Sequence, residues 1–217
     1  MTKPRLITVF ASSLDGRIAL PAGGESHLGS YEDKQILNKS LSKVDATIFG
    51  SGTLKAHKST YLIKNKSKNG NFEISNKQPI SIVVGEPKNF SFEWTYFKQP
   101  IERWLIGSED DCTHNKHFKK CIIFNKSWEN TLINLKKEGL NSIAILGGGK
   151  LIYSFFLENL IDEIQITIVP KIIGGKYTWI PPLDESKIFD LHQAWVIKSI
   201  ESLSTNEVLI NYIKKKA

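Results

Sequence analysis

The sequence predicts an α/β domain with a mixed, mostly parallel sheet, and three observations support this prediction. Short apolar runs typical of buried strands alternate with amphipathic stretches typical of helices. Glycine and polar turn residues separate these runs along the chain. The last two apolar runs, 161–175 and 207–215, have no long helix between them, which indicates antiparallel strands at the carboxyl end.

Eight segments are predicted strands, and one polar segment interrupts them. Six are short apolar runs bounded by turn residues: 6–10, 45–50, 79–84, 103–108, 120–124 and 142–146. The other two are the long segments near the carboxyl end, where apolar and polar residues alternate, and the last of them is expected to be an edge or closing strand. Residues 55–78, rich in lysine and asparagine, predict a long exposed loop.

Three segments predict helices. Residues 30–44 predict the first, because Ser30 can cap its amino end and acidic residues follow in the first turn. Its apolar side chains fall on one stripe: Ile36, Leu37, Leu41 and Val44. Residues 128–139 predict a second helix, and Gly139 is a typical residue just after a helix C-cap. Residues 150–160 predict a third, directly after three glycines.

The composition is that of a globular protein and excludes several classes. The 217 residues are 41% hydrophobic and 24% charged, which suits a single domain over residues 1–217. No apolar run approaches the ~20 residues of a membrane-spanning helix. The apolar stretch after the basic amino terminus is too short for a secretory signal, so we expect a soluble cytoplasmic protein.

The net charge of +7 does not indicate a nucleic-acid partner. Lysine supplies most of the positive charge, and three arginines are few for the phosphate and base contacts of nucleic-acid binders. Aromatic residues are not interleaved with basic ones as in a stacking platform. We expect a solvated lysine-rich surface that also suits an anionic small ligand.

The chain has two cysteines, Cys112 and Cys121, which does not suggest a disulfide-stapled fold. His114 and His117 lie between them, but this spacing matches no usual zinc motif. We expect no metal site there, and instead a polar loop followed by a buried strand.

Gly147, Gly148 and Gly149 stand between a predicted strand and a predicted helix. Such a turn brings backbone N–H groups and the positive end of a helix to one place, where a nucleotide phosphate can bind, and Lys150 could add a charge. The alternative is a tight turn that needs positive φ, which would account for one or two of the glycines. The run matches neither the Rossmann nor the P-loop spacing.

Four segments together resemble one family: "FASSLDGRIA" (10–19), "GESHLG" (24–29), "DATIFGSGTL" (45–54) and residues 145–175. Their order and spacing resemble the reductase domain of riboflavin biosynthesis, the C-terminal half of a bifunctional deaminase–reductase, with a dihydrofolate-reductase-like fold. The zinc signature of the family's deaminase domain is absent, so the resemblance implies a stand-alone reductase. It would transfer a hydride from NADPH to the ribosyl group of 5-amino-6-(5-phosphoribosylamino)uracil or a close analogue.

The resemblance also implies a role for each matching residue. Asp15 matches the motif aspartate and is the candidate catalytic residue, although an aspartate there can also serve the turn alone. Ser26 matches a substrate-contacting serine, and Lys64 could hold the substrate phosphate. The residues that match the cofactor site are Ala11 at the nicotinamide, Thr53 and His57 near the nucleotide, and Gly147, Gly148, Gly149, Lys150, Leu151 and Ile152 in the pyrophosphate loop.

Several substrate-side residues depart from the family's pattern. Leu146 stands where the family has a glutamate, Leu28 replaces an aromatic residue, and the arginine near the end of the first helix is missing. His57 stands where an aspartate is common. His27 and His57 lie in predicted loops near the site, where either could donate a proton or be an ordinary surface residue; His192 has no motif around it.

Three functions therefore stay open. The first is the NADPH-dependent pyrimidine reductase of riboflavin biosynthesis, expected as a homodimer by resemblance. The second is a related NADPH-dependent reductase of another pterin-like or carbonyl substrate. The third is a nucleotide-binding protein that has lost catalysis. Lys88, which follows the third predicted strand, is a candidate contact for the 2′-phosphate of NADPH.

Overall fold

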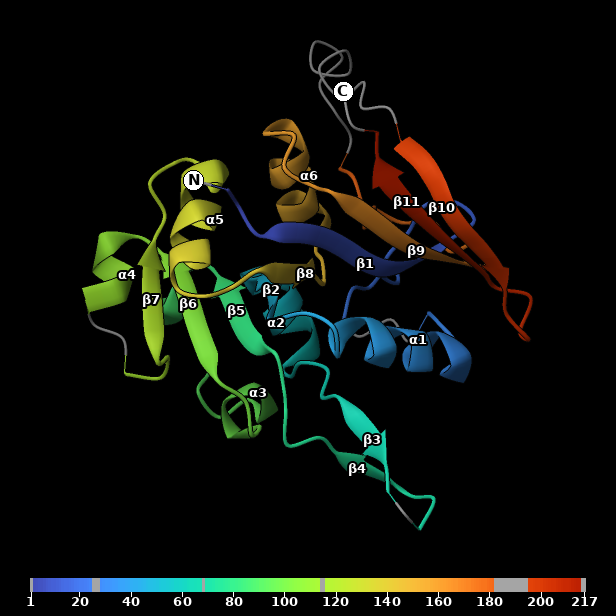
Figure 1. Ribbon diagram of the computed structural model, residues 1–217, viewed down its shortest axis with the longest axis horizontal. Coiled ribbons are helices and arrows are strands. Elements are labelled where there is room, and N and C mark those ends of the chain that lie inside the picture. Colours follow the sequence, from blue (N-terminus) through green and yellow to red (C-terminus); the bar gives the residue numbers. More distant parts are fainter. Residues whose placement is uncertain (1, 25–27, 68, 114–115, 182–194, 216–217) are drawn as a thin grey trace.

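The computed structural model describes residues 2–24, 28–67, 69–113, 116–181 and 195–215. Nine strands of this described part form one sheet (Figure 1): β1 (Arg5–Ser13), β2 (Ala46–Gly50), β5 (Ile80–Val84), β6 (Arg103–Gly107), β7 (Lys120–Ile123), β8 (Ser142–Ile145), β9 (Glu163–Val169), β10 (Trp195–Ser202) and β11 (Val208–Lys214). Their order across the sheet is β10-β11-β9-β1-β8-β2-β5-β6-β7.

The sheet is mixed and mostly parallel, as the sequence predicts. The strands from β9 to β7 pair in parallel, whereas β11 runs antiparallel to β9 and β10 antiparallel to β11. Of the two positions expected for the last strand, edge or closing, the edge position is wrong, because β11 lies between β9 and β10. The sequence gives no clear signal for β10, since most of its residues are exposed and apolar residues do not alternate along it.

Seven helical segments accompany this sheet within the described ranges: α1 (Tyr31–Leu41), α2 (Ser51–His57), the 3₁₀ turn η1 (Pro87–Asn89), α3 (Thr95–Lys98), α4 (Glu109–Thr113), α5 (Trp128–Lys137) and α6 (Gly149–Leu157). The predicted cap of α1 is confirmed, because the Ser30 hydroxyl accepts a hydrogen bond from Asp33 N–H (3.2 Å). Gly139 follows α5 with a φ of 92°, as predicted for a residue beyond a C-cap.

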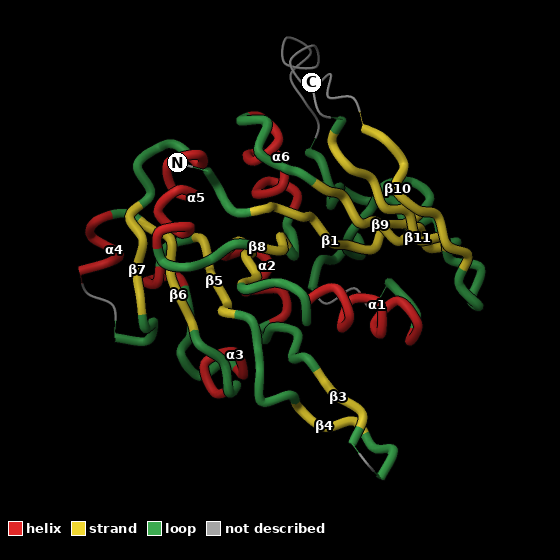
Figure 2. Tube along the Cα trace, viewed as in Figure 1, coloured by secondary structure: helices red, strands yellow, loops and turns green. Residues whose placement is uncertain are grey.

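Successive residues of β1 point to opposite sides of the sheet and so help to build two core layers. Leu6 packs with α5 and α6 in the larger hydrophobic cluster, whereas Ile7 packs with Leu41 of α1 on the other face. Figure 2 shows α5 and α6 above β1 and β8, and α1 below them. The sheet is thus covered by helices on both faces, which leaves the ends of its strands for function.

The polar segment 55–78 is mostly exposed only from Lys64 onward, since residues 56–63 are mostly half-buried and Ile63 is buried, and it is not a plain loop. It completes α2 and then forms a small antiparallel hairpin of β3 (Lys64–Lys66) and β4 (Phe72–Ile74), which projects from the molecule in Figure 1. Every residue of both strands is exposed and each strand has only three residues, so neither is marked in the sequence as a buried strand. Asn38 of α1 ties the hairpin down through hydrogen bonds with the backbone of Lys64.

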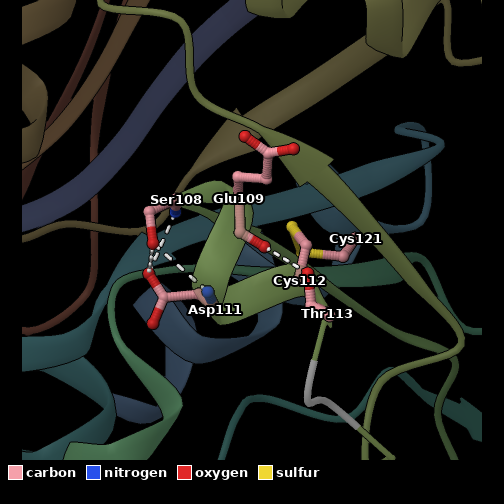
Figure 3. Close-up of a disulfide and its surroundings, with 6 residues drawn as sticks. All are labelled: Ser108, Glu109, Asp111, Cys112, Thr113 and Cys121. Atoms are coloured by element: carbon pink, nitrogen blue, oxygen red, sulfur yellow. Dashed lines mark hydrogen bonds between the residues drawn. A yellow bond between two sulfur atoms is a disulfide. The ribbon is translucent and has the colours of Figure 1, made fainter.

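Cys112 and Cys121 form a disulfide, which corrects the expectation drawn from the low cysteine count. The bridge joins α4 to β7, with 5.4 Å between the two Cα atoms (Figure 3). Ser108 and Asp111 cap α4 reciprocally: the Asp111 carboxylate accepts from the Ser108 N–H (2.9 Å) and hydroxyl (2.6 Å). The chain leaves this short capped helix and comes back beside it as β7, and this tertiary contact brings the two sulfur atoms together.

No helix within the described ranges is long and apolar enough to cross a membrane.

Candidate active site

The parallel strands β1, β8, β2 and β5 all end at the same edge of the sheet, where ligands bind in open α/β sheets. Most of the predicted site residues lie at this edge or just beyond it. Ala11 is near the end of β1, Thr53 lies in the first turn of α2, and the three glycines join β8 to α6.

The glycine loop opens α6 without any side-chain cap. Gly148 is the N-cap residue in an extended conformation, and no side chain accepts from the first turn. Gly147 has a φ of 106° and is buried, and the peptide bond between Gly147 and Gly148 is cis. Uncapped N–H groups at the positive end of a helix form an environment suited to an anion.

Thr53 lies directly against this loop. A Cβ atom placed on Gly148 would be 3.3 Å from Thr53 Oγ1, and one placed on Gly147 would be 3.9 Å away. The contact follows from the topology, because β2 and β8 are paired parallel neighbours and their strand-to-helix turns emerge side by side. A hydroxyl and a set of backbone N–H groups therefore face one small space.

Gly149 has a different neighbour, which the sequence does not reveal. A Cβ atom there would lie 2.3 Å from the carbonyl oxygen of Thr178 and 3.2 Å from that of Trp179. These residues belong to the segment after β9 that we call the strap, residues 171–179. The third glycine is thus required by the protein's own backbone, so the run of three has more than one cause.

The predicted cofactor residues after the glycines differ in their exposure to solvent. The side chains of Leu151 and Ile152 are buried in the core beneath α6, and the N–H groups of both donate to the Gly148 carbonyl (2.9 and 3.1 Å). Lys150 is exposed. Leu151 and Ile152 therefore support the turn by packing, and the predicted cofactor contacts of the loop stay a prediction.

Ala11 is half-buried on β1, beside Thr167 of β9. Since paired residues of neighbouring strands share a face, the small Ala11 side chain lies next to a buried threonine.

Both carboxylate oxygens of Asp15 are engaged in hydrogen bonds. Oδ1 accepts from the Ser13 hydroxyl (2.6 Å) and Ile173 N–H (3.1 Å), and Oδ2 accepts from Gly174 N–H (2.7 Å) and Arg17 Nε (3.4 Å). The Ser13 bond has the largest effect and, with the two backbone bonds, lowers the pKa of Asp15 well below its ordinary value despite opposing desolvation. Asp15 is therefore an ionised acceptor, and its predicted catalytic role stays a prediction.

The remaining predicted residues lie at the periphery. His57 is half-buried at the end of α2, and Lys64 is exposed on the β3–β4 hairpin. Ser26, His27 and His192 lie outside the described residues.

Sequence reasoning missed the strap residues that close over Gly149. The nearest signal is the Gly174-Gly175 pair, which marks a bend after β9 but does not say what the bend reaches.

Comparison with known proteins identifies relatives of the whole fold. The family model described as "RibD C-terminal domain" matches residues 4–208. The riboflavin biosynthesis protein RibD of Buchnera aphidicola is 31% identical over 178 residues, which are 76% of this chain and 48% of that protein. The chain thus spans about half the length of that relative.

A shorter relative matches over most of its own length. The 2,5-diamino-6-ribosylamino-4(3H)-pyrimidinone 5′-phosphate reductase of Archaeoglobus fulgidus is 25% identical over 187 residues, 80% of this chain and 84% of that protein.

Solved structures support the fold. The deaminase/reductase of Thermotoga maritima superposes with a TM-score of 0.78 at 19% identity, covering 98% of this chain and 57% of that one. The riboflavin biosynthesis reductase of Saccharomyces cerevisiae gives a TM-score of 0.69 at 18% identity, covering 98% and 90%. The predicted dihydrofolate-reductase-like fold is confirmed. With the family model matching nearly the full length, the chain belongs to the RibD C-terminal domain family.

Proposed function

We propose that this chain is an NADPH-dependent reductase that converts the ribosyl group of a phosphoribosylamino-pyrimidine to a ribityl chain. The observation that carries the proposal is the pair of uncapped strand-to-helix turns, brought together at Thr53 and Gly148, in a chain of this family. The names of the Archaeoglobus and Buchnera relatives support it, since both are proteins of riboflavin biosynthesis or its reductase step.

The residues present fit a nicotinamide dinucleotide. The space between Thr53 Oγ1 and the glycine loop would be filled by a side chain at position 148, and the amino end of α6 has no cap of its own. Thr53, Gly147, Gly148, Gly149 and Lys150 would hold the phosphates. When bound, the cofactor supplies the hydride.

The chain's own contribution is positioning. Ala11 offers a small side chain at which the nicotinamide ring would lie, and His57 would line the nucleotide at the end of α2. We assign Ser26 and Lys64 to the substrate side, where the Lys64 ammonium would pair with the substrate phosphate as a mobile point charge.

Two pyrimidines are the substrates to compare. The Archaeoglobus relative is named for the 2,5-diamino-pyrimidinone, and the Thermotoga protein for reduction of 5-amino-6-(5-phosphoribosylamino)uracil. We favour the uracil form or a close analogue. The test measures NADPH oxidation by the purified chain with each pyrimidine prepared fresh. Oxidation that requires one of them supports the proposal, whereas tight NADPH binding without turnover on either would leave a nucleotide-binding protein.

The proposal includes a single domain over residues 1–217, a cytoplasmic location and a homodimer. The edge strand β10 supports the dimer, because Val196, Ile197 and Ile200 expose 45%, 52% and 56% of their surface on it. Light scattering on the intact chain would test it: a dimer mass that Ile197→Lys converts to a monomer mass is the expected result.

A further inference from the structure

The strap joins the two loops that frame the proposed cofactor site. At its carboxyl end, the carbonyls of Thr178 and Trp179 lie against Gly149, the first residue of α6. The Trp179 ring stacks on Phe10 of β1 (centroids 5.3 Å apart) and meets Phe156 of α6 edge-on (6.1 Å). The strap therefore packs against the β8–α6 turn, whose N–H groups the proposed function assigns to a phosphate.

The loop after β1 holds the strap along its length. Leu14 N–H donates to the Lys171 carbonyl (2.9 Å), and Ile18 N–H donates to the Tyr177 carbonyl (2.9 Å). Between these two bonds, Asp15 alone takes the N–H groups of two consecutive strap residues. Their sequence separations from Asp15 are 158 and 159 residues, so the carboxylate is a long-range tether.

A further close approach shows how tightly the two segments are matched. A Cβ atom on Gly175 of the strap would lie 3.0 Å from the Cα atom of Pro21. A strap released from Asp15 has no free space on that side, so it would have to move away from the loop and change its contact with Gly149.

We propose that Asp15 is a positioning residue: its carboxylate fixes the strap, and the strap holds the first turn of α6 in the geometry that binds the cofactor's phosphates. The inference rests on the proposed function, because that function assigns the phosphates to this turn. Four donors already occupy the carboxylate, so the proposal gives it a structural role in place of proton transfer to the substrate.

The test is Asp15→Asn, which keeps the size of the side chain. One oxygen becomes an NH₂ group, which cannot accept from the strap's N–H groups. We expect the Kd for NADPH, titrated without substrate, to rise about tenfold, as for a mutation that weakens coupling between two elements. We expect kcat at saturating NADPH to change by less than about twofold and the amides of the strap to exchange hydrogen faster.

The chain contains a matched control at the opposite end of the sheet. Asp45 accepts the N–H groups of Asn141 (2.8 Å) and Ser142 (2.9 Å), and the Ser142 hydroxyl (3.0 Å), where β2 and β8 begin. Because all three bonds go to the one oxygen Oδ2, which an asparagine could supply, Asp45→Ala is the variant that removes this tether. It is expected to lower stability as Asp15→Asn does, while the Kd for NADPH stays at the wild-type value.

A pH series adds a readout that separates positioning from acid–base catalysis. The folded-state pKa of Asp15 is depressed, so its stabilising effect is present above the unfolded pKa of about 3.9 and is lost as the pH falls through the folded value. The stability gap between wild type and Asp15→Asn should be constant from about pH 5 upward and shrink below about pH 4. The pH–kcat profile should keep its shape in the variant.

The outcomes are distinct. An Asp15→Asn variant with normal NADPH affinity and a collapsed kcat would make Asp15 catalytic and overturn positioning, as would unchanged exchange of the strap amides. Wild-type protein that binds no NADPH would overturn the proposed function, and strap exchange would still report whether Asp15 holds the strap. If Asp15→Asn does not fold, Ser13→Ala removes one donor to the carboxylate and should produce a smaller change in the same direction.

Discussion

Two glycine-containing turns lead from parallel strands into helices at the same edge of the sheet, and they use glycine for different reasons. In the β2–α2 turn, a Cβ atom on Gly50 or Gly52 would meet nothing within 4 Å. In the β8–α6 turn, a Cβ atom on Gly149 would meet the chain's own carbonyls, and Gly147 needs a positive φ. The first turn is open, and the second is braced.

The difference shows that glycines in similar strand-to-helix turns can be required for different physical reasons. Open glycines leave room for a ligand, whereas braced glycines leave room for another part of the protein. Thr53 joins the two turns by extending from the open one toward Gly148 of the braced one. Substitutions in the two turns should therefore separate stability from cofactor binding.

The largest effect is expected for Gly149→Ala. The new Cβ atom would stand 2.3 Å from the Thr178 carbonyl oxygen, and backbone cannot swing aside as a side chain can. Moving the strap or α6 should cost about 2–3 kcal/mol of stability. Urea denaturation without ligand measures this cost, and an unchanged midpoint would show that the strap does not brace the turn.

Gly52→Ala is the matched control in the open turn. Since nothing lies within 4 Å of its new Cβ atom, stability should change by less than about 0.5 kcal/mol. A raised Kd for NADPH with unchanged stability would show that the ligand approaches this turn. Equal losses of stability in both alanine variants would remove the distinction between the turns.

Thr53→Val tests the junction of the two turns. The valine keeps the shape but lacks the hydroxyl that faces the glycine loop. Loss of one hydrogen bond to a charged phosphate should raise the Kd for NADPH about tenfold, with little change in stability. A titration followed by nicotinamide fluorescence checks this value, and wild-type affinity would exclude Thr53 as a phosphate contact.

Glu86→Gln should have a smaller effect, on the choice between NADPH and NADH. The end of β5 lies directly against the β2–α2 turn, since a Cβ atom on Gly85 would be 2.7 Å from Ser51 Cβ. Lys88, the candidate 2′-phosphate contact, is paired there with Glu86 (3.2 Å). Both side chains are exposed, so freeing the ammonium should favour NADPH by only about two- to fivefold.

Lys88→Met is the companion variant and should shift the preference toward NADH. The ratio of the two Kd values is the quantity to measure. Identical ratios in the wild type and in both variants would place the 2′-phosphate elsewhere.

The smallest effect on the site is expected from Cys112→Ser. The bridge closes a short loop at β7, an edge strand that β6 and β5 separate from β2. Its loss should cost up to about 2–3 kcal/mol of stability by the loop-entropy model. The Kd for NADPH should change by less than about twofold, and a larger change would connect this edge to the cofactor site. Thiol titration of the freshly isolated protein reports whether the bridge is present.

Much of the fold could be predicted from the sequence because its determinants are local. Caps such as Ser30 and Gly139 act within a few residues, and apolar runs mark buried strands by composition alone. The strand β10 and the β3–β4 hairpin escaped prediction because their exposed residues carry no burial pattern.

The contact between Thr53 and the glycine loop could also be predicted from the sequence. Parallel strands present their carboxyl ends at one edge, so residues that follow such strands gather there. The substrate side stays a prediction: Lys64 lies on a projecting hairpin, and Ser26 lies outside the described residues.

By itself, the sequence determined the alternation of strands and helices, the antiparallel end of the sheet, and the position of a glycine turn suited to a phosphate. Only the tertiary structure decided that Gly149 is a glycine because of Thr178, that Asp15 binds the strap, and that Cys112 meets Cys121. For Gly149 and Asp15, the physical reason is distance along the chain. A cap or a strand is encoded by neighbours, whereas a carbonyl that arrives from a later loop leaves no pattern at the residue it approaches.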